Sequence, residues 1–243
     1  MPTLLVLGAT SDIALAIARK FAANKYDVQL AGRDIPQLQT IQSDISIRHG
    51  VKASVHAFDA IQFSSHTQFF EALPVKPDVT ICVLGSMLDE EKALQEWDTS
   101  RLMIDTNYTG PVSILNIVAK YYASQKKGTI VGISSVAGER GRQSKMIYGS
   151  SKAAFSAYLA GLRNKLFVDK VHVMTVKPGF VYTKMTAELK LPALLTAQPE
   201  QVADAVYKGV VNKKNTVYVK WFWRWIMLII KMIPEFQFKK MKL

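Results

Sequence analysis

The feature that most constrains this 243-residue chain is the regular alternation of short apolar runs with longer amphipathic segments. Runs rich in Val, Ile and Leu predict strands, whereas apolar residues repeated every three or four positions predict helices. The predicted strands span residues 3–8, 26–33, 52–60, 78–85, 128–135, 171–179 and 216–219. The predicted helices span residues 13–24, 36–48, 66–72, 99–125, 148–166 and 199–212.

Strands separated by helices need crossover connections, which favour a parallel sheet covered by helices on both faces. The sequence therefore predicts an α/β fold, with a single doubly wound, Rossmann-type domain and a sheet of about seven strands. We place this domain at residues 1–219. Residues 220–243, called the tail below, are predicted to form a basic, aromatic, amphipathic helical extension.

The net charge of +12 is concentrated near the C-terminus. Residues 213–243 hold eight basic side chains and one acidic side chain, so the body of the chain does not have the charge of a nucleic-acid-binding protein. The single cysteine, Cys82, excludes an intramolecular disulfide framework and favours a reducing compartment. The N-terminal residues lack the pattern of a signal peptide, so we expect a cytoplasmic protein.

The stretch LLVLGATSDIALAI passes from a strand pattern through one glycine into a helix pattern. A helix that begins after such a turn offers free N–H groups to a pyrophosphate. Three glycines are usual in these turns, so this stretch alone fits a simple capped corner equally well. We expect Asp12 to cap its own helix. The candidate cofactor residues here are Gly8, Thr10, Ser11, Asp12 and Ile13.

The ends of the second and third predicted strands bear on the choice of dinucleotide. An acidic residue after the second strand normally binds a ribose 2′-hydroxyl, whereas an arginine there accommodates a 2′-phosphate. This chain has Arg33 at that place, which favours NADP(H) and leaves NAD(H) open. Asp59 ends the third predicted strand and is placed either to accept from an adenine amino group or to cap a helix.

Tyr148 and Lys152 are four positions apart on one predicted helix, so their side chains share a face. An ammonium beside a phenol stabilises the phenolate, which predicts a lowered pKa for Tyr148 and proton exchange near neutral pH. A tyrosine and a lysine at this spacing also occur by chance. Ser135, which ends the preceding strand 13 residues before Tyr148, argues against a chance pair.

With these motifs the chain resembles the short-chain dehydrogenase/reductase family over almost its whole length. The matching segments are GATSDIA, VLG at residues 83–85, DTNYTG, ISS, YGSSK and VKPGFVYTKM. The resemblance implies that Tyr148 donates the proton to a carbonyl, that Lys152 holds the nicotinamide ribose and that Ser135 binds the substrate oxygen. Asn107 would order a proton-relay water.

The same resemblance implies hydride transfer to or from a nicotinamide, without a metal, in a homodimer or homotetramer. It adds cofactor contacts from Gly85, Tyr148, Lys152, Pro178, Gly179 and Thr183. The chain departs from the family pattern in two places, because the turn lacks two glycines and Cys82 and Val83 replace a strand-end asparagine pair. Neither departure touches the four catalytic positions.

A closer resemblance is to the decaprenylphosphoryl-2-keto-ribose reductases. It is carried by SSVAGERGRQSKMIYGSSKA, by KPGFVYTKMTAELK and by the tail. It implies a keto-sugar joined through phosphate to a polyprenyl lipid as the substrate. Arg33 departs from that branch, which is associated with NADH. Arg140, Arg142 and Lys145, just before Tyr148, would then either meet the substrate phosphate or form a solvated loop.

The tail contains an apolar stretch from Trp221 to Ile233, which is too short to span a membrane. On a helix, Lys220, Arg224 and Lys231 are predicted to share one side, and the remaining surface is apolar and aromatic. Two interpretations stay open. The tail lies in the membrane interface at the inner face of the cytoplasmic membrane, or its aromatic residues pack on the body of the protein or on a second subunit.

These observations leave three functions open. The leading one is an NADP(H)-dependent reductase of a sugar-like or lipid-phosphate-linked ketone. The second is a soluble reductase of a small ketone or a 3-oxoacyl substrate. The third is a nicotinamide-binding interaction protein without catalysis, against which the four catalytic residues argue.

Overall fold

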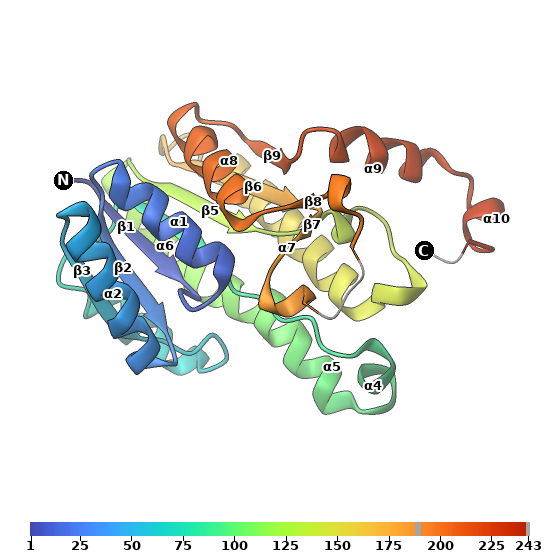
Figure 1. Ribbon diagram of the computed structural model, residues 1–243, viewed down its shortest axis with the longest axis horizontal. Coiled ribbons are helices and arrows are strands. Elements are labelled where there is room, and N and C mark those ends of the chain that lie inside the picture. Colours follow the sequence, from blue (N-terminus) through green and yellow to red (C-terminus); the bar gives the residue numbers. More distant parts are fainter. Residues whose placement is uncertain (188–190, 242–243) are drawn as a thin grey trace.

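Seven parallel strands form the main sheet of the computed structural model, which describes residues 1–187 and 191–241. The strand order is β3-β2-β1-β4-β5-β6-β9 (Figure 1). This arrangement confirms the predicted α/β fold class and the predicted number of strands. The strands are β1 (Thr3–Leu7), β2 (Asp27–Gly32), β3 (Ala53–Ala57), β4 (Val79–Cys82), β5 (Thr129–Ile133), β6 (His172–Pro178) and β9 (Thr216–Val219).

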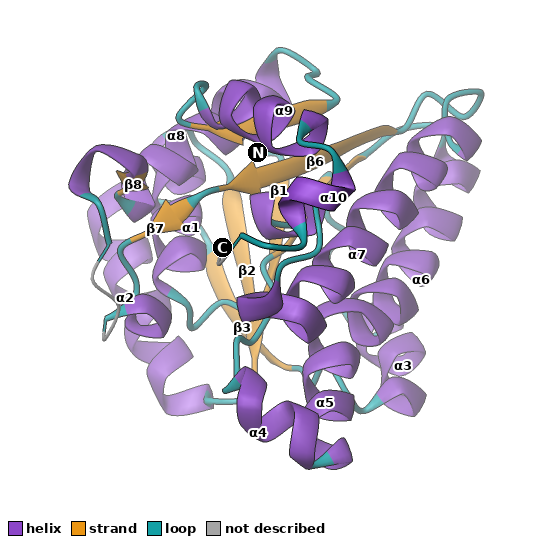
Figure 2. Cartoon of the chain, turned by 90° about the vertical axis from the view of Figure 1, so that its right-hand side faces the viewer, coloured by secondary structure: helices purple, strands orange, loops and turns teal. Residues whose placement is uncertain are grey.

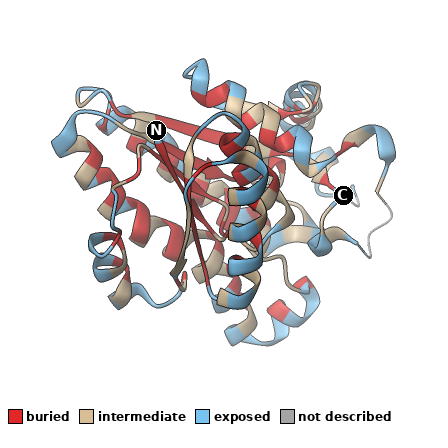
Figure 3. Ribbon diagram, turned by 60° about the vertical axis from the view of Figure 1, so that its left-hand side comes forward, coloured by how far each residue is buried: buried red, intermediate tan, exposed pale blue. Residues whose placement is uncertain are grey.

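Helices cover both faces of this sheet (Figure 2). Alternate strand residues point to opposite faces, so Leu4 and Val6 join one apolar cluster while Leu5 and Leu7 join the other. The five inner strands are consequently buried along most of their length, whereas the edge strands β3 and β9 are mostly half-buried (Figure 3). One face is covered by α1 (Asp12–Ala23), α2 (Ile35–His49) and α8 (Pro199–Val211), and the other by α3 (His66–Glu71), α6 (Gly110–Gln125) and α7 (Met146–Lys165).

The predicted helix over residues 99–125 is divided into three parts. It consists of α5 (Trp97–Ile104), a π-helical turn over Asp105–Thr109, and α6. Asn107 lies in that turn, and such insertions into α-helices frequently mark functional sites. The sequence pattern also did not reveal α4 (Glu90–Gln95) or the small second sheet of β7 (Phe180–Val181) and β8 (Thr196–Ala197).

The tail folds into α9 (Trp223–Met232) and α10 (Glu235–Phe238). Trp223 and Met227 are buried against Val136, so one side of α9 packs on the body of the protein. Arg140 donates to the carbonyl oxygens of Ile230 and Ile233 and so holds the end of α9. Among the described residues, no helix is both long and apolar enough to cross a membrane.

The predicted basic side of the tail helix is wrong. Lys220 precedes α9 in a left-handed backbone conformation and donates to the carbonyl oxygen of Leu194. Lys231 turns inward to a carboxylate oxygen of Glu139, 2.6 Å away. Arg224 is exposed. The difference arises because the helix begins only at Trp223 and because a buried carboxylate attracts one of the three cations.

Glu139 is the residue that joins the tail to the body. Its side chain is only 5% exposed and accepts hydrogen bonds from Lys177, Tyr218 and Lys231. These partners come from β6, β9 and α9. Burial raises the pKa of Glu139, but the three hydrogen bonds outweigh it and lower that pKa to about 2.

We predict that Glu139→Gln lowers the free energy of unfolding by about 3 kcal/mol at pH 7, because Lys177 and Lys231 lose a buried anionic partner. A lowered folded-state pKa stabilises the protein above the unfolded value near 4.5, and this contribution is lost as the pH falls from there toward 2. In urea unfolding, the difference in free energy of unfolding between wild type and variant should therefore become smaller below about pH 4.5.

The control is Glu71→Gln, because Glu71 is an exposed acidic residue on α3. This variant should change stability little at any pH. A Glu139→Gln variant whose loss of stability is the same at pH 3 and pH 7 would contradict the role given to the charge.

Candidate active site

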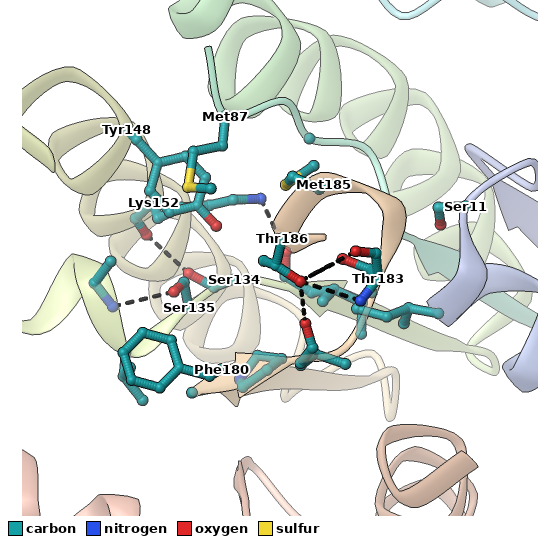
Figure 4. A pocket seen from close by; sticks show the side chains of 18 of the residues that line it. Ser11, Met87, Ser134, Ser135, Tyr148, Lys152, Phe180, Thr183, Met185 and Thr186 are labelled. Atoms are coloured by element: carbon teal, nitrogen blue, oxygen red, sulfur yellow. Dashed lines mark hydrogen bonds between the residues drawn. The ribbon is translucent and has the colours of Figure 1, made fainter. Parts of the chain in front are cut away.

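A cavity of about 370 Å³ lies at the carboxyl ends of β1, β4, β5 and β6 (Figure 4). Doubly wound sheets bind their ligands at this edge. The loops that leave these four strands form its walls, together with the start of α7 and one residue of α9. The predicted site residues that line it are Ser11, Asp12, Ile13, Gly85, Ser135, Tyr148, Lys152, Pro178, Gly179 and Thr183.

Lys152 lies in the middle of this cavity and is only 4% exposed. Its ammonium donates to the carbonyl oxygens of Leu84, 3.3 Å away, and Ile133, 3.2 Å away. These carbonyls follow β4 and end β5, where the parallel ladder leaves acceptors free. Burial lowers the pKa of Lys152 to about 8. The hydroxyl of Ser134 donates to the carbonyl oxygen of Lys152 and fixes this turn of α7 against β5.

Asn107 is fully buried behind the cavity, across Gly85 from Lys152. Its amide accepts from the N–H of Ser86 and donates to the carbonyl oxygens of Ser86 and Met103. A Cβ at Gly85 would lie 2.9 Å from the Lys152 Nζ and 3.0 Å from the Asn107 Oδ1. Only glycine therefore lets this strand end approach both side chains.

Tyr148 and Ser135 face the cavity from α7 and from the end of β5 (Figure 4). Burial raises the pKa of Tyr148, and a hydrogen bond with the Ser135 side chain opposes that shift. The expected lowering of the Tyr148 pKa by Lys152 is therefore wrong for this structure. Desolvation acts on both groups and disfavours the phenolate and the ammonium alike.

Glu90 holds the start of α7, and no sequence motif pointed to this role. Its carboxylate is buried and accepts from the N–H groups of Ile147 and Tyr148, each 3.0 Å away. A negative charge at a helix N-terminus is favourable, because the first N–H groups have no partner within the helix. Glu90 thereby fixes the backbone of Tyr148.

The first turn of α1 forms the other end of the cavity. Gly8 adopts a positive φ of 83°, and its N–H donates to the carbonyl oxygen of Ala31. Ser11 is the N-cap and accepts from the N–H of Ala14. The prediction that Asp12 caps its own helix is wrong, because Ser11 already holds that position. Asp12 instead accepts from the N–H of Lys184, 2.7 Å away.

Arg33 and Asp59 border a second cavity of about 770 Å³ at the ends of β2 and β3. Arg33 is exposed there and follows β2 directly. Asp59 accepts from the N–H of Ile61 and so closes its own turn, whereas the N-cap of the next helical turn (Phe63–Ser65) is Gln62, so Asp59 does not cap a helix. The two cavities together follow the carboxyl edge of the sheet from β3 to β6.

Trp223 also lines the cavity, although it comes from the tail. Its indole N–H donates to the carbonyl oxygen of Leu195, and its ring packs edge-on against Phe180. A Cβ at Gly179 would lie 2.0 Å from the Trp223 Nε1, so the indole lies directly on that glycine. No local pattern links positions this far apart, whereas Ser134 stands beside Ser135 in the Ile-Ser-Ser motif and was recognisable there.

Comparison with known proteins agrees with this geometry. An uncharacterized oxidoreductase of Streptomyces coelicolor is 34% identical over 243 residues, which cover 98% of this chain and 95% of that protein. An uncharacterized oxidoreductase of Mycobacterium tuberculosis is 29% identical over 239 residues, which cover 97% and 95%.

The fold itself also has a match among solved structures. A short-chain dehydrogenase from Sphingobium yanoikuyae, in complex with NADPH, superposes with a TM-score of 0.83 at 21% identity and 97% coverage of both chains. A family model described as short chain dehydrogenase matches residues 2–193. The chain therefore belongs to the short-chain dehydrogenases/reductases, a family of NAD(P)-dependent oxidoreductases, as the resemblance of its motifs indicated.

Proposed function

We propose that this protein is an NADP(H)-dependent carbonyl reductase that acts on a sugar-like ketone, carried through a phosphate on a polyprenyl lipid, at the inner face of the cytoplasmic membrane. The observation that carries the reaction class is the meeting of Ser135, Tyr148 and Lys152 in one cavity, with Asn107 directly behind it. The substrate and the membrane are the finer parts of the proposal, and each has its own support.

The residues along the sheet edge fit a nicotinamide dinucleotide. The first turn of α1 offers N–H groups to a pyrophosphate, and Gly85 leaves room beside Lys152 where any side chain would collide. Arg33, exposed at the end of β2, is placed to meet a 2′-phosphate. When bound, NADPH supplies the hydride. Lys152 would hold the nicotinamide ribose, and Pro178, Gly179 and Thr183 would contact the nicotinamide end.

The side chains of the chain supply the proton and the orientation. The Ser135 hydroxyl donates to the substrate carbonyl oxygen and polarises it, while Tyr148 gives its proton to the same oxygen as hydride reaches the carbon. The product is a secondary alcohol and the oxidised cofactor. This step leaves Tyr148 as a phenolate, which the Ser135 hydrogen bond favours, and Asn107 would order a water for its reprotonation.

The part of the cavity beyond Tyr148 supports a substrate with both apolar and anionic parts. Met87, Phe180 and Trp223 form apolar walls there, and Arg142 and Lys145 add positive charge. Arg140 does not take part, because the tail carbonyls and Glu235 occupy its guanidinium. A small neutral ketone would use few of these contacts.

The outward side of the tail supports contact with a membrane surface. Trp225, Ile229 and Met232 lie on the side of α9 opposite Trp223 and Met227, and Trp221 and Phe236 extend this exposed apolar stripe at both ends. Their exposed fractions lie between 53% and 73%. A helix that shows aromatic and aliphatic residues to solvent, bordered by cations, is typical of an interfacial helix.

The occupant of this stripe that its charge favours is an anionic lipid surface. Arg224 borders the stripe, with its guanidinium 5.8 Å from the centre of the Trp225 ring. Lys239 and Lys240 follow at its far end. Within residues 1–187 and 191–241, none of these three cations forms an ion pair. Each such cation near an anionic bilayer contributes about 1 kcal/mol to binding.

We predict that Tyr148→Phe lowers kcat about a thousandfold, since the proton donor is lost. The affinity for NADPH, followed by fluorescence titration, should stay within about twofold, because the cofactor makes most of its contacts elsewhere. Tyr158→Phe is the control, since Tyr158 lies on the same helix and its hydroxyl donates to Asn116, whereas it is not one of the described residues that line the cavity. Turnover by Tyr148→Phe at the wild-type rate would contradict the catalytic role.

We predict that the wild type prefers NADPH over NADH and that Arg33→Leu lowers kcat/KM for NADPH about ten- to a hundredfold, because a charged contact to the 2′-phosphate is lost. The value for NADH should change less than about threefold, because NADH lacks that phosphate. Both cofactors are measured with one ketone. A wild-type enzyme that prefers NADH would overturn this assignment of Arg33.

We predict that the protein sediments with vesicles that contain phosphatidylglycerol, and that the double variant Trp225→Ser/Ile229→Ser binds at least about tenfold more weakly, because apolar contact area is lost. The control is Phe167→Ser/Val168→Ser, which removes two apolar residues just beyond α7 that are more exposed than Trp225 and Ile229. Equal vesicle binding by all three proteins would contradict the membrane role. A change of oligomeric state confined to the tail variant would assign the stripe to a second subunit.

A further inference from the structure

Arg142 is a charged group in the cavity wall, and no anionic side chain among the described residues pairs with it. Its Nε is buried without a hydrogen-bond partner from those residues, and its Nη2 contacts the thioether sulfur of Met227, 3.4 Å away. Lys145, three residues later, lines the same cavity. In the part of the chain that the structure describes, neither side chain is ion-paired with a carboxylate.

The neighbouring cations, by contrast, have hydrogen-bond acceptors within the protein. Arg140 is bound by carbonyl oxygens and by Glu235, and Lys177 is bound by Glu139. A partly buried guanidinium without such acceptors is unfavourable, and burial lowers the pKa of Arg142 accordingly. Sequences tolerate such a group where a ligand supplies the missing acceptors.

The charge of the cavity wall also favours an anionic ligand. Among the residues that the structure describes, the charged side chains that line the cavity are Arg142, Lys145, Lys152 and Lys184, which are basic, and Asp12, which is acidic. Asp12 accepts from the backbone of Lys184 at the dinucleotide end. The part of the cavity wall that contains Arg142 and Lys145 therefore carries positive charge. The sulfur of Met227, on α9, contacts the Arg142 guanidinium.

We propose that Arg142, assisted by Lys145, binds an anionic group of the substrate, either a phosphate ester or a carboxylate, while the substrate carbonyl lies at Tyr148. A guanidinium offers paired N–H donors that match the oxygens of both anions. This specificity site rests on the proposed reductase function and adds to it the residues that recognise the negative charge of the substrate.

The first test compares turnover of dihydroxyacetone with that of dihydroxyacetone phosphate, and of 2-pentanone with that of 4-oxopentanoate, using NADPH. Arg142→Gln should lower kcat/KM for the better anionic ketone about ten- to a hundredfold and leave its neutral partner within about twofold. The pair of ketones whose anionic member loses more kcat/KM shows whether the site prefers a phosphate or a carboxylate. Arg48→Gln is the control, because Arg48 is an exposed arginine on α2. An equal loss for charged and neutral ketones, or none, would overturn the proposal.

The second test does not need turnover. Calorimetry with the NADP⁺-saturated enzyme compares phenyl phosphate, benzoate and phenol, so that the cofactor already fills its own phosphate sites. At least one anion should bind the wild type, and Arg142→Gln should weaken it about tenfold without affecting phenol. Anions that bind no better than phenol would contradict the site. If the enzyme reduces none of the ketones but still binds an anion through Arg142, the proposed reductase function is refuted and the anion site is supported.

Discussion

The arrangement of the site depends on one buried ammonium, that of Lys152. It is held where β4 and β5 end, by the carbonyl oxygens of Leu84 and Ile133. A cation buried this deeply is stable only where several acceptors converge, and the carboxyl edge of a parallel sheet provides them. Gly85 must then lack a side chain, and α7 must approach β5 through Ser134. The position of Tyr148, four residues earlier on the same helix, follows from these constraints.

Two contacts between distant parts of the chain close the cavity around this centre. Asp12, at the start of α1, holds the backbone of Lys184, and Trp223 of the tail lies on Gly179. The tail is therefore a wall of the active site as well as a surface element. Glu139, in the turn after Ser135, connects the cavity wall to the tail, because it accepts hydrogen bonds from Tyr218 of β9 and Lys231 of α9. In the function proposed here, contact of α9 with a bilayer would place the substrate end of the cavity near the lipid.

Structural features that depend on residues close together in the sequence were predicted well. The alternation of strand and helix patterns predicted the parallel sheet, and the motifs of Ser135, Tyr148 and Lys152 selected three residues that line one cavity. Predictions that depended on the neighbours of a charge were less successful. Asp12 was expected to cap its own helix, and Lys152 was expected to lower the pKa of Tyr148. In both cases another group or burial decided the outcome, and neither is visible in a local pattern.

The sequence by itself determined the fold class and the family and was sufficient to predict four catalytic positions, because hydrophobic periodicity and short motifs act over neighbouring residues. Only the tertiary structure decided which charges are satisfied and which are not. Glu90 and Glu139 acquire their partners from other elements, whereas Arg142 is left in the cavity wall without a carboxylate among the described residues. The physical reason is that desolvation and hydrogen bonding depend on every element packed around a group, and folding alone brings those elements together.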